Sequence, residues 1–277
     1  MRRGSPISHA RMAMKILFIG DIVGKPGRRA VRELLPWIVE ERRIDFVIAN
    51  CENAAAGFGV TSEVIEELYG CRIDVLTSGN HIWDKKEIMD VAEGYETLLR
   101  PANYPAGAPG RGSVVVARPD GIRVGVINLA GRVFMNPLDC PFRTADREIE
   151  EMKKKTRVIV VDMHAEATSE KIAMGWYLSG RVTAVLGTHT HVQTADDRIL
   201  PGETAYITDV GMTGPFDSVI GIRKEVILQR FLLQMPNKFD VAKGDVRLQG
   251  VTVEIDPDGR AKAIERVNVS LQEEHKC

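Results

Sequence analysis

The 277-residue chain has no long apolar segment, few cysteines and almost no net charge. No stretch reaches the roughly 18–20 continuous apolar residues that a membrane-spanning helix needs. The N-terminus is basic but no apolar segment follows it, which argues against a secretory signal peptide. Lys and Arg total 37 and Asp and Glu total 38, so no overall basic field attracts nucleic acid or an anionic membrane. We therefore expect a soluble globular protein without a membrane partner.

The cysteines indicate a reducing compartment. Cys51, Cys71, Cys140 and Cys277 show no Cys-x-x-Cys pairing, and four are too few for a disulfide scaffold in a chain of this length. We expect reduced thiols and a cytoplasmic location.

Short apolar runs alternate with segments of helical periodicity along the chain, which predicts an α/β protein with parallel strands and later hairpins. The expected strands cover residues 15–21, 45–50, 73–78, 113–118, 122–129, 157–162, 182–187, 205–208, 247–255 and 261–270. The expected helices cover residues 28–43, a segment opening at 61–64, 84–93, 143–155, 169–179 and 223–234. Pro36 is expected to kink or split the first helix.

The chain shows no internal repeat, low-complexity linker or composition shift. We predict a single domain over residues 14–270, a disordered extension at residues 1–13 and a C-terminal tail at residues 271–277.

The polar residues of interest follow the apolar runs. Ligands of open α/β sheets bind beyond the carboxyl ends of the strands, so these residues are expected to converge although they are far apart in sequence. All four internal histidines belong to this set. The candidates are Asp21, Glu52, Asn53, Asn80, His81, His164, His189 and His191.

Oxygen and imidazole donors without thiolate suit Mn, Fe, Co or Zn better than Ca²⁺ or a structural zinc. His189 and His191 are two residues apart on an expected extended segment, so both would point to the same side. A carboxylate bridging two cations would form a two-metal site for attack on phosphorus. Taken singly, His164 could equally be an ordinary core histidine, and Gly79-Asn80 could equally form a turn. Together the clusters predict a metal site.

The motifs Gly20-Asp21, Gly79-Asn80-His81, His164 and Gly187-Thr188-His189-Thr190-His191 resemble those of the calcineurin-like metallophosphoesterases. Three departures narrow the match. Val23 stands where a histidine ligand is usual, Glu52 stands where the bridging residue is usually Asp, and the last motif reads Gly-Thr-His-Thr-His. The chain is similar to the YmdB-type bacterial metallophosphoesterases over about residues 14–270. The segments that carry this similarity are 16–28, 52–55, 79–84 and 131–135.

The resemblance implies a four-layer α/β/β/α sandwich with mixed sheets and a dinuclear iron or manganese centre. It also implies metal-dependent hydrolysis of small phosphodiesters such as 2′,3′-cyclic nucleotides. On this hypothesis a metal-bridging hydroxide is the nucleophile and His81 is the general acid.

The hypothesis assigns each candidate a role. The first metal is held by Asp21, Glu52 and His191, with Asn53 close by. The second is held by Glu52, Asn80, His164 and His189. Asn53 is also a candidate for orienting a phosphoryl oxygen. The absent histidine at Val23 leaves the first metal with fewer protein ligands.

Two other functions stay open, a phosphomonoesterase of broad specificity and a regulatory metal-binding protein with weak turnover. The near-neutral charge favours a small substrate over long RNA. A homo-oligomer is expected only because such assemblies are common.

Several neighbouring residues have two interpretations. Asp84 is expected to cap a helix rather than orient His81. The remaining ones would contact substrate or else serve local structure: Lys25, Arg28, Arg132, Phe134, Met135 and Asp209.

Overall fold

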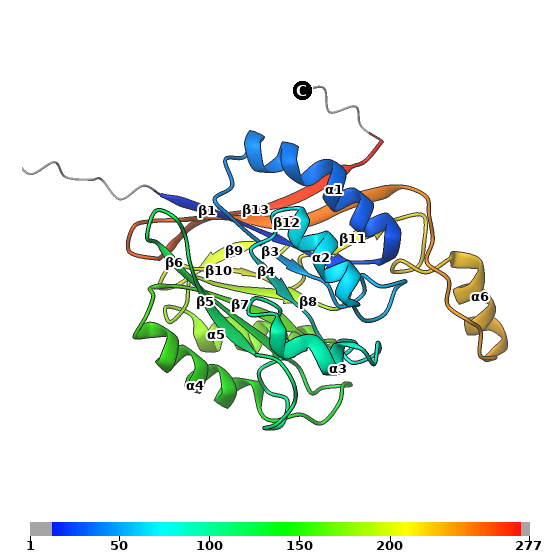
Figure 1. Ribbon diagram of the computed structural model, residues 1–277, viewed down its shortest axis with the longest axis horizontal. Coiled ribbons are helices and arrows are strands. Elements are labelled where there is room, and N and C mark those ends of the chain that lie inside the picture. The colour runs from blue at the N-terminus through cyan, green and yellow to red at the C-terminus, as the bar shows by residue number, and fades with distance from the viewer. Residues whose placement is uncertain (1–12, 273–277) are drawn as a thin grey trace, which may run out of the picture.

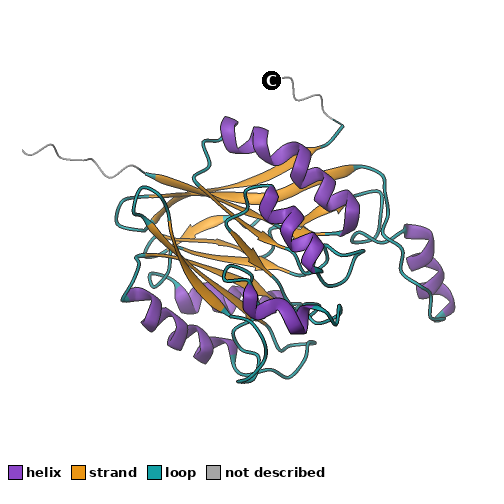
Figure 2. Cartoon of the chain, viewed as in Figure 1, coloured by secondary structure: helices purple, strands orange, loops and turns teal. Residues whose placement is uncertain are grey.

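The computed structural model describes residues 13–272, which form two facing sheets with helices on their outer sides (Figures 1 and 2). The first sheet contains β1 (Met14–Ile19), β2 (Asp21–Ile22), β3 (Phe46–Asn50), β4 (Val75–Thr77), β11 (Met212–Pro215), β12 (Val246–Ile255) and β13 (Ala261–Ser270). The second contains β5 (Ser113–Ala117), β6 (Arg123–Ala130), β7 (Val158–His164), β8 (Ala184–Thr188), β9 (Arg198–Leu200) and β10 (Thr204–Ile207).

The helices are α1 (Gly24–Glu41), α2 (Ser62–Gly70), α3 (Ile88–Val91), α4 (Pro141–Lys153), α5 (Thr168–Leu178) and α6 (Lys224–Leu233). One apolar cluster joins α1 and α2 to the first sheet, and another joins α4 and α5 to the second. A third cluster fills the space between the sheets. The predicted four-layer α/β/β/α sandwich is therefore confirmed.

Both sheets are mixed, as expected from the chain order. The first runs β2-β11-β12-β1-β3-β4, with β13 beside β12, and the second runs β5-β6-β7-β8-β10-β9. The pairs β1–β3, β3–β4, β6–β7 and β7–β8 are parallel, whereas β5–β6 and β12–β13 are antiparallel. The parallel pairing brings the carboxyl ends of β3 and β4 to one edge of their sheet, and those of β7 and β8 to one edge of theirs.

Strand alternation decides which polar side chains enter the space between the sheets. In β7, Val158 and Val160 belong to the cluster between the sheets, whereas Ile159 and Val161 face the helices. Asp162 and His164 continue the first set by the same alternation. The strand is thus apolar along its length and places polar groups in this layer only at its carboxyl end.

Some expected elements differ from the structure. The helix expected at 84–93 is reduced to α3 and a short 3₁₀ turn, because residues 80–87 form consecutive turns. The first helix begins at Gly24, so Lys25 to Gly27 are helical rather than a loop. Pro36 lies inside this continuous helix and does not split it. Strands β9 and β11 were not expected.

The ends of the chain bear on the domain prediction. Residues 1–12 of the expected extension and 273–277 of the expected tail lie outside the described residues. Leu271, assigned to the tail, instead packs against the first sheet, and its N–H donates to the carbonyl of Val246. Among the helices of residues 13–272, none combines the length and the apolar character that crossing a bilayer requires.

Candidate metal centre

The nitrogen Nε2 of His164 lies at the centre of the polar group between the strand ends. It is 3.0 Å from Glu52 Oε1, 3.1 Å from Asn80 Oδ1 and 3.0 Å from His189 Nδ1. Glu52 follows β3 and Asn80 follows β4 in the first sheet, whereas His164 ends β7 and His189 follows β8 in the second. The ligand atoms of Glu52, His164 and His189 lie within 4.8 Å of one another.

A buried hydrogen-bonded chain fixes the orientation of the His164 ring. The Thr188 hydroxyl lies 2.7 Å from Asp162 Oδ1 and 2.9 Å from His164 Nδ1. Because a carboxylate only accepts, Thr188 donates to Asp162 and accepts from Nδ1–H of His164. In a neutral His164 the lone pair of Nε2 therefore points toward Glu52, Asn80 and His189, where three more electron-rich atoms converge.

The pKa shifts within the group show that a positive charge at His164 is favourable. Burial by itself would raise the pKa of Glu52, but the neighbouring histidines, His164 foremost, together outweigh it and hold that pKa at about 2. Burial opposes a charge on His164, yet the Glu52 carboxylate raises its pKa to about 9. Burial, and then the adjacent His164, lowers the pKa of His189 to about 3. Without a cation, a proton on His164 balances the group, and a metal ion would supply the same charge.

Asp21 and His191 extend the group on the other side. Asp21, in β2, is fully buried and its burial raises the pKa of the carboxyl. Its Oδ2 accepts from the backbone N–H of His189 at 3.2 Å, whereas Oδ1 has no hydrogen-bond partner and lies 3.8 Å from His191 Nε2. His191 Nδ1 donates to the carbonyl of Ile220 at 2.9 Å, which turns Nε2 toward Asp21.

Asn53 presents a second buried oxygen without a partner. Its Oδ1 makes no hydrogen bond, and its Nδ2 donates to the carbonyl of Gly57 at 3.0 Å. Buried polar atoms in folded proteins are nearly always satisfied, so two unpaired oxygens beside a carboxylate–histidine group fit a cation. The donor set fits a divalent metal ion.

The two histidines after β8 do not lie on an extended segment, which corrects the expectation from their spacing. His189 has φ 97° and His191 has φ 63°. Asp209 holds the turn between them by accepting from the N–H of Thr190 at 3.0 Å and from its hydroxyl at 2.7 Å. Lys171, also buried, lies 2.7 Å from the same Asp209 oxygen. Asp209 thus supports the histidine segment and does not line the cleft.

His81 lies beside this group. Its backbone N–H donates to Glu52 Oε2 at 3.1 Å, and its Nδ1 donates to Asp84 Oδ2 at 2.8 Å. The ring meets Phe58 edge to face, with the centroids 5.1 Å apart. Asp84 therefore orients His81, and the expectation that it caps a helix was wrong, since α3 begins only after Glu87.

None of the remaining candidates has a side-chain hydrogen bond or ion pair to the group among the described residues. Arg28 joins α1 to α2 through Glu67 at 2.6 Å and donates to the carbonyl of Ala54 at 2.6 Å. Phe134 is 89% exposed, and Met135 packs against the core between the second sheet and its helices. Two more make no contact with the group through their side chains in the described structure: Lys25, exposed in the first turn of α1, and Arg132, whose backbone N–H donates to Glu170.

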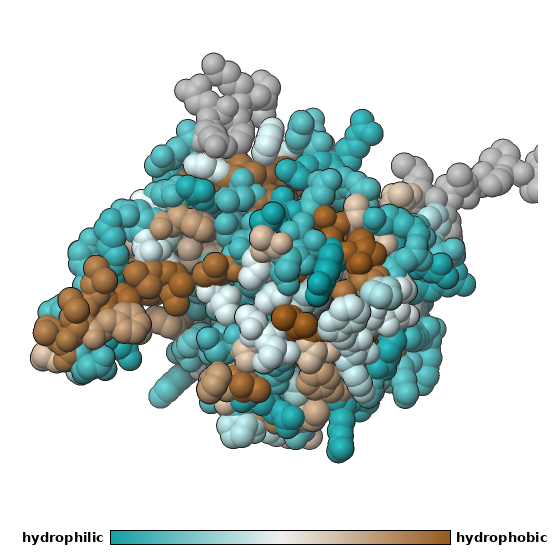
Figure 3. Space-filling view, turned by 180° about the vertical axis from the view of Figure 1, so that it is seen from behind, coloured by the Kyte–Doolittle hydropathy of each residue, from teal (hydrophilic) through white to brown (hydrophobic). Residues whose placement is uncertain are grey.

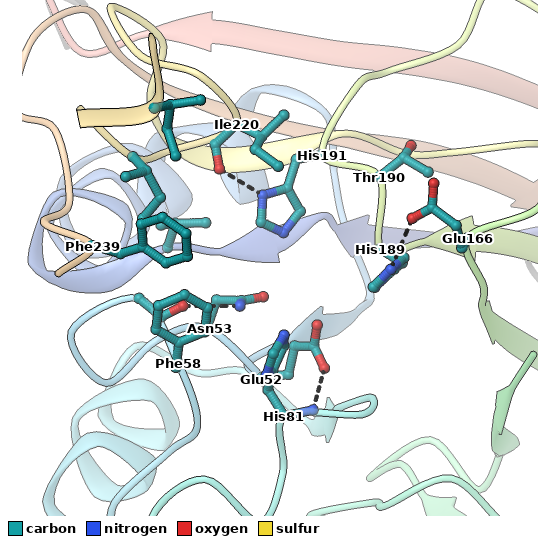
Figure 4. Close-up of a pocket in the computed structure, with 14 residues that line it drawn as sticks. Glu52, Asn53, Phe58, His81, Glu166, His189, Thr190, His191, Ile220 and Phe239 are labelled. Atoms are coloured by element: carbon teal, nitrogen blue, oxygen red, sulfur yellow. Dashed lines mark hydrogen bonds and ion pairs between the residues drawn. The ribbon is translucent and has the colours of Figure 1, made fainter. Parts of the chain in front are cut away.

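A cleft of about 300 Å³ opens onto the group (Figure 4). Glu52, Asn53, His81, His189 and His191 line it, as the sequence predicted, together with residues that were not predicted. Glu166 Oε2 lies 3.1 Å from His189 Nε2, so it fixes Nδ1 toward His164. Its position two residues after His164 was an available signal. Val23, which stands where a histidine is usual, also lines the cleft. The rest of the apolar lining has no such signal: Phe58, Ile220, Ile222, Ile227 and Phe239.

The chain is similar to known proteins along most of its length. The family model described as YmdB-like protein matches residues 17–267. The 2′,3′-cyclic-nucleotide 2′-phosphodiesterase of Bacillus subtilis is 50% identical over 262 residues, covering 95% of this chain and 98% of that protein. A novel phosphatase from Mycoplasma pneumoniae has a TM-score of 0.88 at 34% identity, covering 94% of both chains. A hypothetical protein from Thermus thermophilus has a TM-score of 0.87 at 44% identity, covering 93% of this chain and 99% of that one.

The position of Gly79 predicts that Gly79→Ala disrupts metal binding. A Cβ there would lie 2.2 Å from His164 Nε2 and 2.4 Å from Glu52 Oε2, so the ligand atoms must move apart. We expect roughly a 10- to 100-fold loss of Mn²⁺ affinity in titration calorimetry. Gly70→Ala is the control, because a Cβ at Gly70 meets nothing within 4 Å. Equal affinities of the two variants would contradict the arrangement described.

Proposed function

The chain belongs to the YmdB-like family, and on this basis we propose that it is a metal-dependent phosphodiesterase acting on small diesters such as 2′,3′-cyclic nucleotides. One observation carries the proposal: four electron-rich atoms converge at His164 Nε2, directly beside an oriented histidine, in an open cleft. This arrangement suits chemistry that binds an anion through a metal and protonates a leaving group.

We propose that the site is dinuclear, with Glu52 shared. Asp21, His191 and the unpaired Oδ1 of Asn53 form one half of the group. Asn80, His164 and His189 form the other half. Iron or manganese fits these oxygen and imidazole donors. Bound ions would neutralise the phosphate and lower the pKa of a bound water.

Asn53 is better placed as a ligand than as a phosphoryl donor. Its Oδ1 has no partner, whereas one amide hydrogen already bonds to the carbonyl of Gly57. We therefore assign the oxygen to the metal, and leave only the second amide hydrogen for substrate.

His81 is assigned as the general acid. Because Nδ1 donates to Asp84, the other nitrogen, Nε2, is the one left to hold a transferable proton. The leaving alkoxide of a cyclic diester takes that proton as the P–O bond breaks. Glu52 accepts from the His81 backbone, which sets the distance between the acid and the metal group.

The size of the cleft favours a small substrate, since about 300 Å³ accommodates a mononucleotide-sized ligand rather than a folded strand. Cys51, Cys71 and Cys140 are free thiols, which fits the proposed cytoplasmic location. A single domain over residues 14–270 remains part of the proposal, and the three cores between and outside the sheets support it.

The shared role of Glu52 predicts that Glu52→Gln loses metal. The substitution keeps the shape but removes the buried negative charge that balances the cation. We expect at least roughly a tenfold fall in metal per chain after dialysis, measured by elemental analysis. Glu63→Gln, on the exposed start of α2, is the matched control and should retain metal. Full metal content in Glu52→Gln would exclude the bridging role.

The acid assignment predicts that His81→Asn retains metal but loses turnover. We expect kcat for 2′,3′-cyclic AMP to fall by about 10²–10⁴-fold. The fall should be much smaller for bis(p-nitrophenyl) phosphate, whose leaving group needs no proton. Loss of metal, or an equal fall for both substrates, would argue that His81 has another role. Parallel assays with a monoester test the phosphomonoesterase alternative.

A further inference from the structure

One wall of the cleft is apolar and faces the metal group. Phe58 and Phe239 lie with their ring centroids 6.1 Å apart and their planes at 29°, and Phe58 in turn contacts His81. Ile220 and the buried Ile222 and Ile227 complete this wall. Figure 4 shows the two rings beside Asn53 and His191, on the side of the cleft away from Glu166. Phosphate-ester hydrolysis itself requires none of these side chains.

Both rings are held in place. Phe58 is on the turn that Asn53 closes through Gly57, so it is fixed relative to a proposed metal ligand. Phe239 follows α6, and the Arg230 guanidinium of that helix lies 4.8 Å from its ring centroid. The aromatic pair is therefore a supported, half-buried surface that lines the cleft.

We propose that this wall, which we call the aromatic wall (Phe58 and Phe239), binds the nucleobase of the substrate. The proposal rests on the proposed function, and deepens it by naming the side chains that would hold the base of such a diester. Every base has an apolar face, so stacking on such a wall selects nucleotides without selecting one base. The phosphate then lies at the metal group and the leaving oxygen beside His81.

The test compares two cyclic diesters that differ in the base, 2′,3′-cyclic AMP and glycerol 1,2-cyclic phosphate. Phe239→Ala should raise KM for the nucleotide by about 5- to 150-fold, the range that alanine substitution of a stacking aromatic gives. It should leave kcat, and both constants for the glycerol ester, unchanged. Phe239→Trp should restore the nucleotide KM, and Phe134→Ala, at an exposed ring outside the cleft, should have no effect.

An equal loss for both esters, or an unchanged KM for the nucleotide, would overturn the aromatic wall as a base site. If the wild-type protein hydrolyses neither ester, the proposed function fails and the base site is tested by binding. Titration calorimetry of adenosine 3′-phosphate then compares the wild type with Phe239→Ala. Weaker binding by the variant supports the base site, whereas equal binding, or none by the wild type, refutes it.

A second surface is carried by different observations. Helix α6 extends from the body of the molecule (Figure 1), and its outer side forms a brown apolar projection in Figure 3. Ile227 is the buried side chain of α6, whereas Leu228 is 56%, Phe231 71% and Leu232 80% exposed. Leu233, Met235 and Ile220 are each more than half exposed as well.

We infer that this α6 surface (Leu228, Phe231, Leu232, Leu233 and Met235) binds a second copy of the chain. At about 150–200 Å² for a large side chain, it presents on the order of 600 Å² of apolar area. That is near the roughly 800 Å² per partner of a standard interface, and at the limit for an isolated monomer. Lys224, Glu225 and Arg230 give the helix both charge signs, whereas helices that bind membrane surfaces are predominantly basic.

Sedimentation velocity over a concentration series tests the second copy. The wild type should be dimeric or larger at micromolar concentration, and Phe231→Glu/Leu232→Glu should be monomeric with unchanged circular dichroism. Trp176→Glu, at a half-exposed aromatic on α5, is the control and should assemble like the wild type. A monomeric wild type, or a double variant that still assembles, would overturn the inference. So would a monomer that binds phosphatidylglycerol vesicles through this surface.

Discussion

The orientation of His164 is the constraint on which the site depends. Its Nδ1 is committed to Thr188, and Thr188 to Asp162, so Nε2 must face Glu52, Asn80 and His189. The lone pairs of Nε2 and its neighbours, about 3 Å apart in a buried space, are costly unless a positive charge compensates them. Either a proton or a cation can supply that charge. The hydrogen-bonded chain of Asp162, Thr188 and His164 thus both stabilises the fold and makes the space favourable for a positive ion.

The same network joins the two sheets. Asn50 ends β3 in the first sheet, and its Nδ2 lies 3.2 Å from Asp162 Oδ2 in the second. Apolar packing fills the rest of the space between the sheets, so polar groups are confined to one end of it. Any shift of one sheet relative to the other would therefore separate Glu52 and Asn80 from His164 and His189. Sheet packing and the geometry of the group are therefore one requirement, which explains how side chains so distant in sequence converge without a local scaffold.

The sequence was informative where side-chain chemistry follows strand periodicity. Asp21, Glu52, Asn80 and His164 could be placed together because apolar runs end directly before them and parallel strands align their carboxyl ends. The reason given for His189 and His191 was wrong, although both residues lie in the group. Their left-handed backbone depends on Asp209 and Lys171, which are brought to that turn only by tertiary structure. Asp84 was misassigned because a cap and an orienting carboxylate have the same local sequence pattern.

The cleft residues that the sequence did not indicate are proposed to have a different function from those that it did indicate. Metal binding needs charged or imidazole groups, and these are conspicuous where they interrupt an apolar strand. Recognition of the rest of a substrate needs only apolar area. A loop that contains Phe58 or Phe239 has the same composition as a loop whose phenylalanine simply packs against the core. The metal group therefore lies at strand ends and in the turns that follow them, whereas Phe239 follows α6 and Phe58 shares the turn of Asn53. Because Phe239 rests on a segment that holds no member of the metal group, we expect a substitution there to change which diester binds without moving the side chains of that group.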